Sequence, residues 1–223
     1  DADAVDDNCD NCPTWNGAQT NTDGDGVGNL CESSLYDFSQ IASFEAFVAG
    51  APGFSNYGGT WDTTKADRVE GIGPNSGIAG NFLQNTQLTP PFAVETVFIY
   101  PDNGPNNAKY AGVAVGASLG TNGNITALYA CVFERDAKKV QIWKYEGNYT
   151  KVAESGAVNT NAANGDWRRV RAVAAPNADG LSTLTCEYYD KKGKSASASY
   201  TPPSSTSTDA AFAGLAGLRL YND

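Results

Sequence analysis

The sequence predicts an all-β protein, an antiparallel β-sandwich that follows a short acidic segment. Runs rich in β-branched and aromatic residues recur about every 8–15 residues and are separated by Gly, Asn and Pro. The composition, with 24 Gly and no Met, is typical of a β-rich exported protein. No long amphipathic helical pattern occurs, and residues 38–49 predict one short helix at most.

Charge divides the chain into two parts. Residues 1–32 contain eight acidic side chains and no Lys or Arg, whereas residues 33–223 contain 17 acidic and 15 basic side chains. Most of the net charge of −10 therefore lies in the first part. We expect an acidic segment at 1–32 and one domain at 33–223. Because no stretch has an excess of Lys and Arg, the charge pattern excludes a basic nucleic-acid-binding protein.

The chain has no histidine, and this excludes several kinds of site. A Ser-His-Asp triad, a Cys-His pair and His-ligated zinc or haem all require that residue. No apolar run approaches the roughly 18 residues of a membrane span, so we expect no membrane insertion. The N-terminus lacks a signal-peptide pattern, so a secreted protein would be numbered after processing. The composition favours a secreted, extracellular or cell-surface location.

Residues 21–32 match the calcium loop D-x-[DN]-x-[DN]-G-x5-E, with Asn at the first position. Oxygen-bearing side chains occupy loop positions 1, 3, 5, 9 and 12, which are Asn21, Asp23, Asp25, Asn29 and Glu32. Gly26 permits the tight turn, and Val27 can offer its backbone carbonyl. Because Ca²⁺ prefers such converging oxygens, we expect calcium here. The alternative is a solvated acidic linker.

A Cys-Asp-Asn-Cys-Pro stretch at residues 9–13 precedes the loop, and no amphipathic helices bracket the loop as in an EF-hand. With Asn16, Gln19 and the run from Asp23 to Glu32, this stretch resembles the type 3 repeat of thrombospondins and its bacterial relatives. The resemblance implies a Cys12–Cys31 disulfide.

The first ten residues resemble the end of a preceding loop of the same kind. If Cys9 is aligned with Cys31, the acidic residues fall at loop positions 3, 5, 9 and 12, as Asp1, Asp3, Asp7 and Asp10. Ala4 replaces the turn glycine, so we expect weaker calcium binding there. The chain is expected to begin inside a repeat array, with the partner of Cys9 in the repeat upstream.

Nine runs in residues 33–223 predict strands. They are Phe92–Tyr100, Tyr110–Ser118, Ile125–Arg135, Val140–Glu146, Tyr149–Ala153, Trp167–Ala174, Leu181–Tyr189, Ser195–Tyr200 and Leu215–Tyr221. The stretch from Tyr110 to Val173 carries an AGVAVGAS strand, LYACVFERD, VQIWKYEGNYTKVAES and an Asn-Gly-Asp-Trp strand start. This order resembles concanavalin A-like jelly rolls, in particular laminin-G-like bacterial modules. The resemblance implies a jelly roll over residues 33–223.

In that family the stretch that resembles Phe212–Leu218 is followed by one more strand, whereas this chain ends at Asp223. Three interpretations are open: a trimmed chain, a shorter sandwich, or an open sheet edge that another copy fills. An open edge accepts a strand by backbone pairing, so the third interpretation predicts self-association.

Two cysteines lie in the predicted strands. Cys186 alternates with Thr185 and Glu187 and is expected to face the core, and Cys131 lies in a comparable strand. The pattern allows either a bridge between the sheets or two buried thiols.

Jelly rolls of this class include glycosidases and polysaccharide lyases. The E-x-D-x-x-E pattern is absent, and the nearest carboxylate pairs, Glu134/Asp136 at a strand-to-turn junction and Asp67/Glu70 in a loop, are expected to be solvated charges. Lyases of this fold generally use His. We therefore expect a protein that is not an enzyme, with a hydrolase or lyase as the disfavoured alternative.

Aromatic residues of one hairpin indicate a saccharide face. If Val140 and Ile142 are buried, the alternation turns Trp143 and Tyr145 outward, and Tyr149 follows the turn. Each could instead be a packing residue, and Trp61 is expected in a loop. The sequence thus predicts a calcium-stabilised, extracellular, non-catalytic module for adhesion or assembly that binds polysaccharide or glycoconjugate. The alternative is a filament or layer subunit joined by strand exchange.

Overall fold

The chain divides into two compact units, Asp1–Ala46 and Phe47–Asp223, and each is described by itself. The computed structural model describes residues 11, 18–24, 26–29, 51, 53–65, 68–72, 79–100, 109–160, 165–176, 181–203 and 212–221. The helix predicted over 38–49 and the boundary predicted after residue 32 lie outside these residues.

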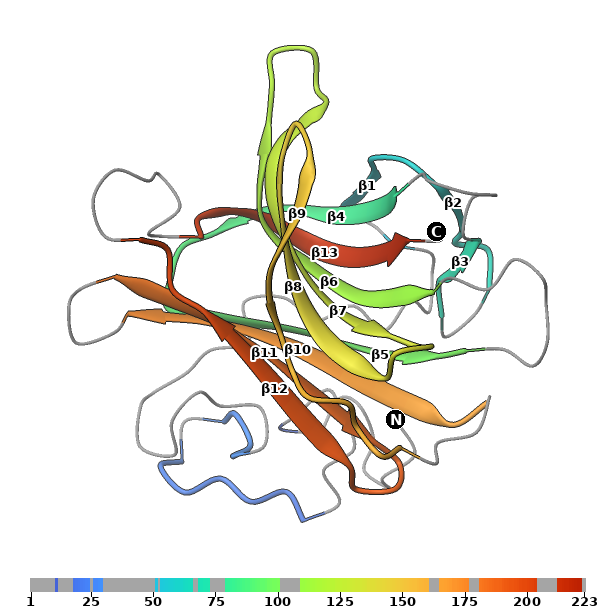
Figure 1. The fold of residues 1–223 in the computed structure, drawn as a ribbon, viewed down its shortest axis with the longest axis vertical. Coiled ribbons are helices and arrows are strands. Elements are labelled where there is room, and N and C mark those ends of the chain that lie inside the picture. The colour runs from blue at the N-terminus through green and yellow to red at the C-terminus, as the bar shows by residue number, and fades with distance from the viewer. Residues whose placement is uncertain are drawn as a thin grey trace. The chain divides into compact units, whose positions relative to one another are not determined.

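The described part of the second unit holds thirteen strands and no helix (Figure 1). The strands are β1 (Phe54–Asn56), β2 (Thr60–Asp62), β3 (Glu70–Ile72), β4 (Ala79–Leu88), β5 (Phe92–Ile99), β6 (Tyr110–Leu119), β7 (Ile125–Glu134), β8 (Lys139–Glu146), β9 (Tyr149–Glu154), β10 (Trp167–Pro176), β11 (Ser182–Asp190), β12 (Ser195–Tyr200) and β13 (Gly214–Tyr221). No described segment is a helix of the length and apolarity that a membrane crossing needs.

These strands form two large antiparallel sheets and a small ribbon. The seven-stranded sheet has the order β1-β4-β13-β6-β7-β8-β9, and the four-stranded sheet has the order β12-β11-β10-β5. Strands β2 and β3 pair with each other. The predicted all-β, antiparallel, sandwich-like fold is confirmed.

All nine predicted strands are present, and their ends differ from the predicted ones by at most two residues. Strands β1 to β4 were not predicted. Strands β1, β2 and β3 have three residues each, which is too short for a periodic pattern. Strand β4 has the sequence AGNFLQNTQL, which contains two Asn residues, and Asn is generally depleted in strands. Glu70 opens β3 and Trp61 lies in β2, so placing these two residues in loops was wrong.

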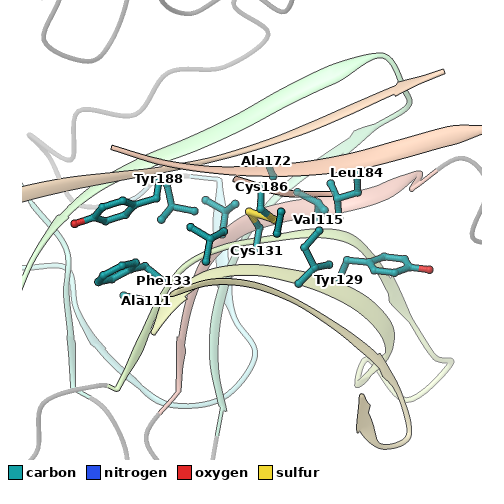
Figure 2. Close-up of a cluster of buried hydrophobic side chains, with 14 of the residues drawn as sticks. Ala111, Val115, Tyr129, Cys131, Phe133, Ala172, Leu184, Cys186 and Tyr188 are labelled. Atoms are coloured by element: carbon teal, nitrogen blue, oxygen red, sulfur yellow. A yellow bond between two sulfur atoms is a disulfide. The ribbon is translucent and has the colours of Figure 1, made fainter. Parts of the chain in front are cut away.

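The core lies between the two large sheets. Its fully buried side chains come from both sheets, and they include Val113, Val115, Phe133, Val140, Ile142, Val170, Leu184 and Tyr188. Phe133 of β7 and Tyr188 of β11 stack with ring centroids 4.1 Å apart (Figure 2). Alternation along each strand places these residues on the inner face, because successive side chains point to opposite faces.

A disulfide joins the two sheets through this core. Cys131 of β7 and Cys186 of β11 are bonded, with Cα atoms 5.6 Å apart, and both side chains are fully buried (Figure 2). The core-facing orientation predicted for both cysteines is confirmed. Of the two open interpretations, the bridge is correct and the pair of thiols is wrong.

Strand β13 lies in the interior of the seven-stranded sheet. It pairs with β4 on one side and with β6 on the other. The outer strands of this sheet are β1 and β9, and those of the four-stranded sheet are β12 and β5. Within the two large sheets as described, strand exchange with another chain would therefore involve one of these four strands.

Candidate functional site

The predicted aromatic face is the outer face of the seven-stranded sheet, which points away from the four-stranded sheet. Val140 and Ile142 of β8 are fully buried in the core between the sheets. Because side chains alternate along a strand, Trp143 and Tyr145 of β8 point to the outer face. The orientation predicted for these two residues is confirmed.

The outer face carries a second hydrophobic cluster. Its buried members are Leu83, Tyr110, Ala114, Ala117, Leu128, Ala130, Val132 and Leu215. Tyr110 meets Trp143 edge to face with ring centroids 6.3 Å apart, and it lies 5.5 Å from the ring of Tyr221. At the other end of the face, the rings of Tyr145 and Tyr149 are 4.7 Å apart. Four strands thus contribute aromatic rings to one surface.

The sheet curls around this face. The Tyr149 ring of edge strand β9 lies 4.7 Å from the guanidinium carbon of Arg219 in β13. Strands β6, β7 and β8 lie between them, so their backbones would be about 19 Å apart in a flat sheet. The contact requires a concave outer face, and these three strands bend visibly in Figure 1.

Two glycines on the outer face allow the strands to approach closely. A Cβ atom on Gly112 of β6 would collide with the backbone of Cys131 and Val132 in β7. A Cβ atom on Gly217 of β13 would collide with the backbone of β4. The centre of the concave face is therefore made of residues with little or no side chain.

Two adjoining pockets hollow the outer face. The first has a volume of about 160 Å³ and is lined by Tyr110, Ala130, Val132, Trp143, Tyr149, Arg219 and Tyr221. The second has a volume of about 420 Å³ and is lined by Asn56, Tyr57, Gly58, Asn81, Gly123, Asn124, Ile125, Tyr145 and Tyr149. Tyr149 forms a wall of both pockets. The volume of the second pocket is within the range of about 300–1,000 Å³ that is usual for small-molecule sites, and the volume of the first is below that range.

Arg219 is the charged residue of the first pocket. Its Nη1 donates a hydrogen bond to Oδ1 of Asn81 at 2.8 Å, and its side chain is buried, with 4% exposed. Burial lowers the pKa of the guanidinium, and the Tyr149 and Tyr221 hydroxyls oppose this change. Burial also raises the pKa of the Tyr149 hydroxyl, and Arg219 opposes part of the rise. At neutral pH the site therefore presents a cation beside a neutral phenol.

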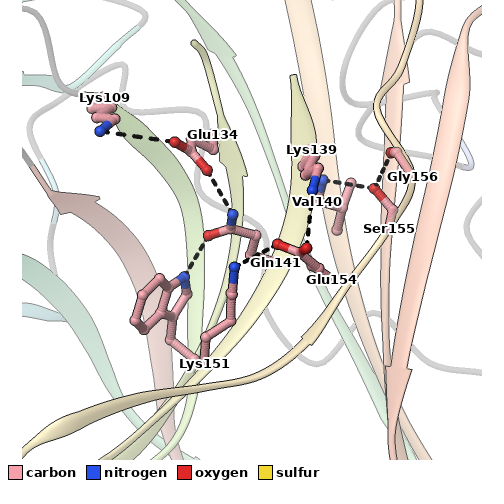
Figure 3. Close-up of polar contacts among 10 residues, drawn as sticks. Lys109, Glu134, Lys139, Val140, Gln141, Lys151, Glu154, Ser155 and Gly156 are labelled. Carbon is pink, nitrogen blue, oxygen red and sulfur yellow. Dashed lines mark hydrogen bonds and ion pairs between the residues drawn. The ribbon is translucent and has the colours of Figure 1, made fainter. Parts of the chain in front are cut away.

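A polar chain orients Trp143 at the edge of the first pocket. Its Nε1 donates to Oε1 of Gln141 at 2.7 Å, and Nε2 of Gln141 donates to Oε2 of Glu134 at 2.6 Å (Figure 3). Lys109 Nζ lies 3.8 Å from Glu134 Oε1. Glu134 is only 9% exposed, so its prediction as a solvated charge was wrong: the Gln141 amide and Lys109 replace water around it. Its position at the end of β7, with Asp136 in the turn beyond, is as predicted.

The structure thus gathers Trp143, Tyr145 and Tyr149, and it adds residues that the sequence did not single out. These are Tyr57, Asn81, Tyr110, Arg219 and Tyr221. A basic residue in the predicted strand Leu215–Tyr221 was the one available signal for Arg219. Trp61, by contrast, packs on Phe82 with ring centroids 5.4 Å apart, which is a structural role.

The described residues of the predicted calcium loop form a tight turn. Gly26 has a φ of +96°, the left-handed conformation that glycine adopts readily. The Gly24 amide donates to Oδ1 of Asn21 at 2.7 Å, and the Thr22 amide donates to Oδ1 of Asn29 at 2.8 Å. Asp23 and the buried Val27 are also described.

The other predicted loop residues lie outside the described residues. They are the ligands Asp25 and Glu32, the half-loop residues Asp1, Asp3, Asp7 and Asp10, and the cysteines Cys9, Cys12 and Cys31. Within the described ranges, no group of three or more His, Cys, Asp or Glu side chains gathers as a metal-ligand set.

The outer face combines flat apolar rings with an amide, several phenols and a guanidinium. Such a surface suits a ligand that has both C–H faces and hydrogen-bonding groups. Comparisons with protein-family models, with curated proteins and with solved structures found no match. Function is therefore inferred from the geometry of this face and from the acidic loop.

Proposed function

We propose that the protein is a secreted, calcium-stabilised, non-catalytic module that binds saccharides through the concave outer face of its seven-stranded sheet. The observation that carries this proposal is the convergence of Trp143, Tyr145 and Tyr149 with Arg219 around two adjoining pockets. Adhesion to, or assembly on, a glycan-bearing cell surface is the role that follows from such binding.

The chemistry of the pockets supports a sugar as the ligand. Aromatic faces pack against the C–H faces of a sugar ring, and amide, phenol and guanidinium groups hydrogen-bond its hydroxyls. Trp143 is held by Gln141, and Tyr149 packs against Arg219, so two rings are oriented before any ligand binds. Preorganised groups lose less side-chain entropy on binding, which favours affinity.

The resemblance to laminin-G-like jelly rolls supports the same proposal at the level of the fold. We propose that the second unit is a jelly roll of this class. Two antiparallel sheets around one core, with the concave sheet carrying the pockets, support this assignment. Jelly rolls of this class include many proteins that act on or bind polysaccharides.

A glycan array tests the binding proposal. We expect the intact chain to bind a set of related glycans, and the variant Tyr145→Ala/Tyr149→Ala to lose those signals because both pockets lose a wall. Circular dichroism should show that this variant remains folded. An array without signal above background would contradict the proposal, and release of reducing ends from any bound polysaccharide would show an enzyme instead.

We also propose that residues 21–32 bind Ca²⁺, as the type 3 repeat resemblance implies. The positive φ of Gly26 and the hydrogen bonds that Asn21 and Asn29 accept from the backbone of Gly24 and Thr22 fit a tight loop of this kind. Asn21, Asp23, Asp25, Asn29 and Glu32 would supply side-chain oxygens, and Val27 a carbonyl. Calcium would supply rigidity to a segment that is too short to build a large core of its own.

Removal of calcium should loosen residues 1–32 and leave the sandwich folded, because the sandwich has its own buried core. We expect chelation to raise amide hydrogen exchange in residues 1–32 alone, and Asp25→Ala to have the same effect at ordinary calcium. Ser197→Ala, on the exposed strand β12, is a matched control that should leave exchange in the loop unchanged. Loss of the whole β-sheet signal on chelation would contradict this division of the chain.

A filament or layer subunit is the second candidate function, and one observation favours it. Edge strand β5 exposes Val97 and Ile99, whose exposed fractions are 42% and 57%. An edge strand with apolar side chains can pair with a strand of another copy. Electron microscopy of the concentrated protein should then show filaments, and glycan binding without filaments would favour the saccharide role alone.

A further inference from the structure

Arg219 is a buried cation on the floor of the first pocket, and the described residues give it no anionic partner. Its contacts include a hydrogen bond to the Asn81 amide oxygen at 2.8 Å, the Tyr149 ring at 4.7 Å, and a hydrogen bond with the Tyr149 hydroxyl. Among the described residues, no carboxylate lies within ion-pair distance of its guanidinium. A charge with 4% of its surface exposed is costly to bury without compensation.

The lysines near the outer face differ from Arg219 in this respect. Lys109 lies 3.8 Å from Glu134. Lys139 and Lys151 lie 2.9 Å and 2.5 Å from the carboxylate of Glu154. These two lysines also lower the pKa of Glu154, which keeps it ionised. The lysine charges are therefore compensated by described carboxylates, whereas no described carboxylate compensates the charge of Arg219.

The described lining of both pockets contains no carboxylate at all. It consists of apolar side chains, phenols, one indole, asparagines and glycines, with Arg219 as its one charged member. The aromatic walls restrict access of water to the guanidinium, which strengthens its attraction for an anion. Arginine also offers a planar fork of N–H donors that matches a carboxylate or a sulfate.

We propose that the outer face selects acidic saccharides, and that Arg219 binds the carboxylate or sulfate group of one sugar residue while Trp143 and Tyr149 pack against the sugar rings. This assignment rests on the proposed saccharide function and names the ligand class of the same site. Asn81 and the Tyr149 hydroxyl hydrogen-bond the guanidinium, and a guanidinium has five N–H donors, so donors remain for the ligand.

Isothermal titration with matched ligands tests the assignment. The probes are an oligogalacturonate, its fully methyl-esterified form, a sulfated galactan oligosaccharide and its unsulfated counterpart. The two members of each pair share a sugar backbone and differ in charge. We expect the acidic member of at least one pair to bind about tenfold or more tightly than the neutral member, as a charge-assisted hydrogen bond implies. The pair that responds identifies carboxylate or sulfate as the recognised group.

Arg219→Met keeps the bulk of the side chain and removes its charge. This variant should bring the two members of the responding pair to within about twofold in affinity, because the acidic member loses more affinity than the neutral member does. Lys191→Met removes one positive charge from the β11–β12 turn of the other sheet and should leave the preference intact. If Arg219→Met does not fold, the comparison of acidic and neutral ligands on the wild-type chain still tests the acidic preference.

The outcomes separate this inference from the proposed function. Equal affinity for the acidic and neutral members would overturn the acidic preference and leave saccharide binding standing. A preference that survives in Arg219→Met would overturn the role of Arg219. No binding of any probe, together with an array without signal, would overturn saccharide binding itself. Tighter binding of poly-glutamate than of any saccharide would show that the site takes an acidic peptide.

Discussion

Replacing Cys131 and Cys186 together with alanine is expected to lower the free energy of unfolding of the sandwich by about 4 kcal/mol. The disulfide closes a loop across a sequence separation of 55 residues, and the chain-entropy relation gives this value for a loop of that length. The loss should be large because the bridge links the two sheets at the centre of their shared core. Denaturant unfolding monitored by circular dichroism measures it.

Two comparisons make this experiment specific. Wild-type protein unfolded in the presence of a phosphine reductant should reach the same midpoint as the double variant, because both unfold without the cross-link. Val113→Ala, also in the core, removes apolar volume but keeps the bridge, so reductant should lower its stability further, whereas the stability of the double variant should not respond to reductant. A double variant within about 1 kcal/mol of the wild type would show that the bridge contributes little.

Trp143→Ala should weaken binding of the strongest array ligand by about 30-fold or more. Truncating an aromatic residue at the centre of a binding surface typically costs about 2 kcal/mol or more, and about 1.4 kcal/mol corresponds to a factor of ten in affinity. Trp143 lines the first pocket and contacts Tyr110, so its loss removes one aromatic wall and frees another. Titration calorimetry with the wild type and the variant measures the change.

Trp143→Phe keeps a flat apolar face and should recover most of the affinity, which a purely structural defect would not allow. Val97→Ala, on the outer strand of the other sheet, should bind the ligand as the wild type does. Thermal unfolding of all three variants should show that they remain folded at the binding temperature. Unchanged affinity of Trp143→Ala would remove the outer face from the binding surface.

Local patterns explain which parts of the fold could be predicted. Strand β11 alternates buried and half-buried side chains along its whole length, and this period of two is visible in the sequence. The same alternation placed Val140 and Ile142 inside and Trp143 and Tyr145 outside. Strand β4 was not predicted because its polar residues give it no clear strand pattern. It forms a strand because it pairs with its neighbours β1 and β13.

Only part of the candidate site could be predicted from the sequence, for a related reason. Tyr145 and Tyr149 come from one hairpin, so a short stretch of sequence already places them together. Arg219 and Asn81 are 138 residues apart, and their hydrogen bond exists because β13 lies beside β4. No local sequence pattern specifies the order of the strands in a sheet. The one signal, a lone arginine in a predicted strand, therefore did not indicate which residues would surround it.

The sequence by itself determined the all-β class, the positions of nine strands, the faces on which Val140, Ile142, Trp143 and Tyr145 lie, and the acidic character of residues 21–32. These features depend on spacings of a few residues along the chain, which the backbone geometry of strands and turns converts directly into structure. Only the tertiary structure decided that Cys131 and Cys186 form a bridge, that β13 is a central strand, and that the sheet curls until Tyr149 meets Arg219. Those features depend on pairing between distant segments, which is set by packing of the whole core rather than by any one stretch.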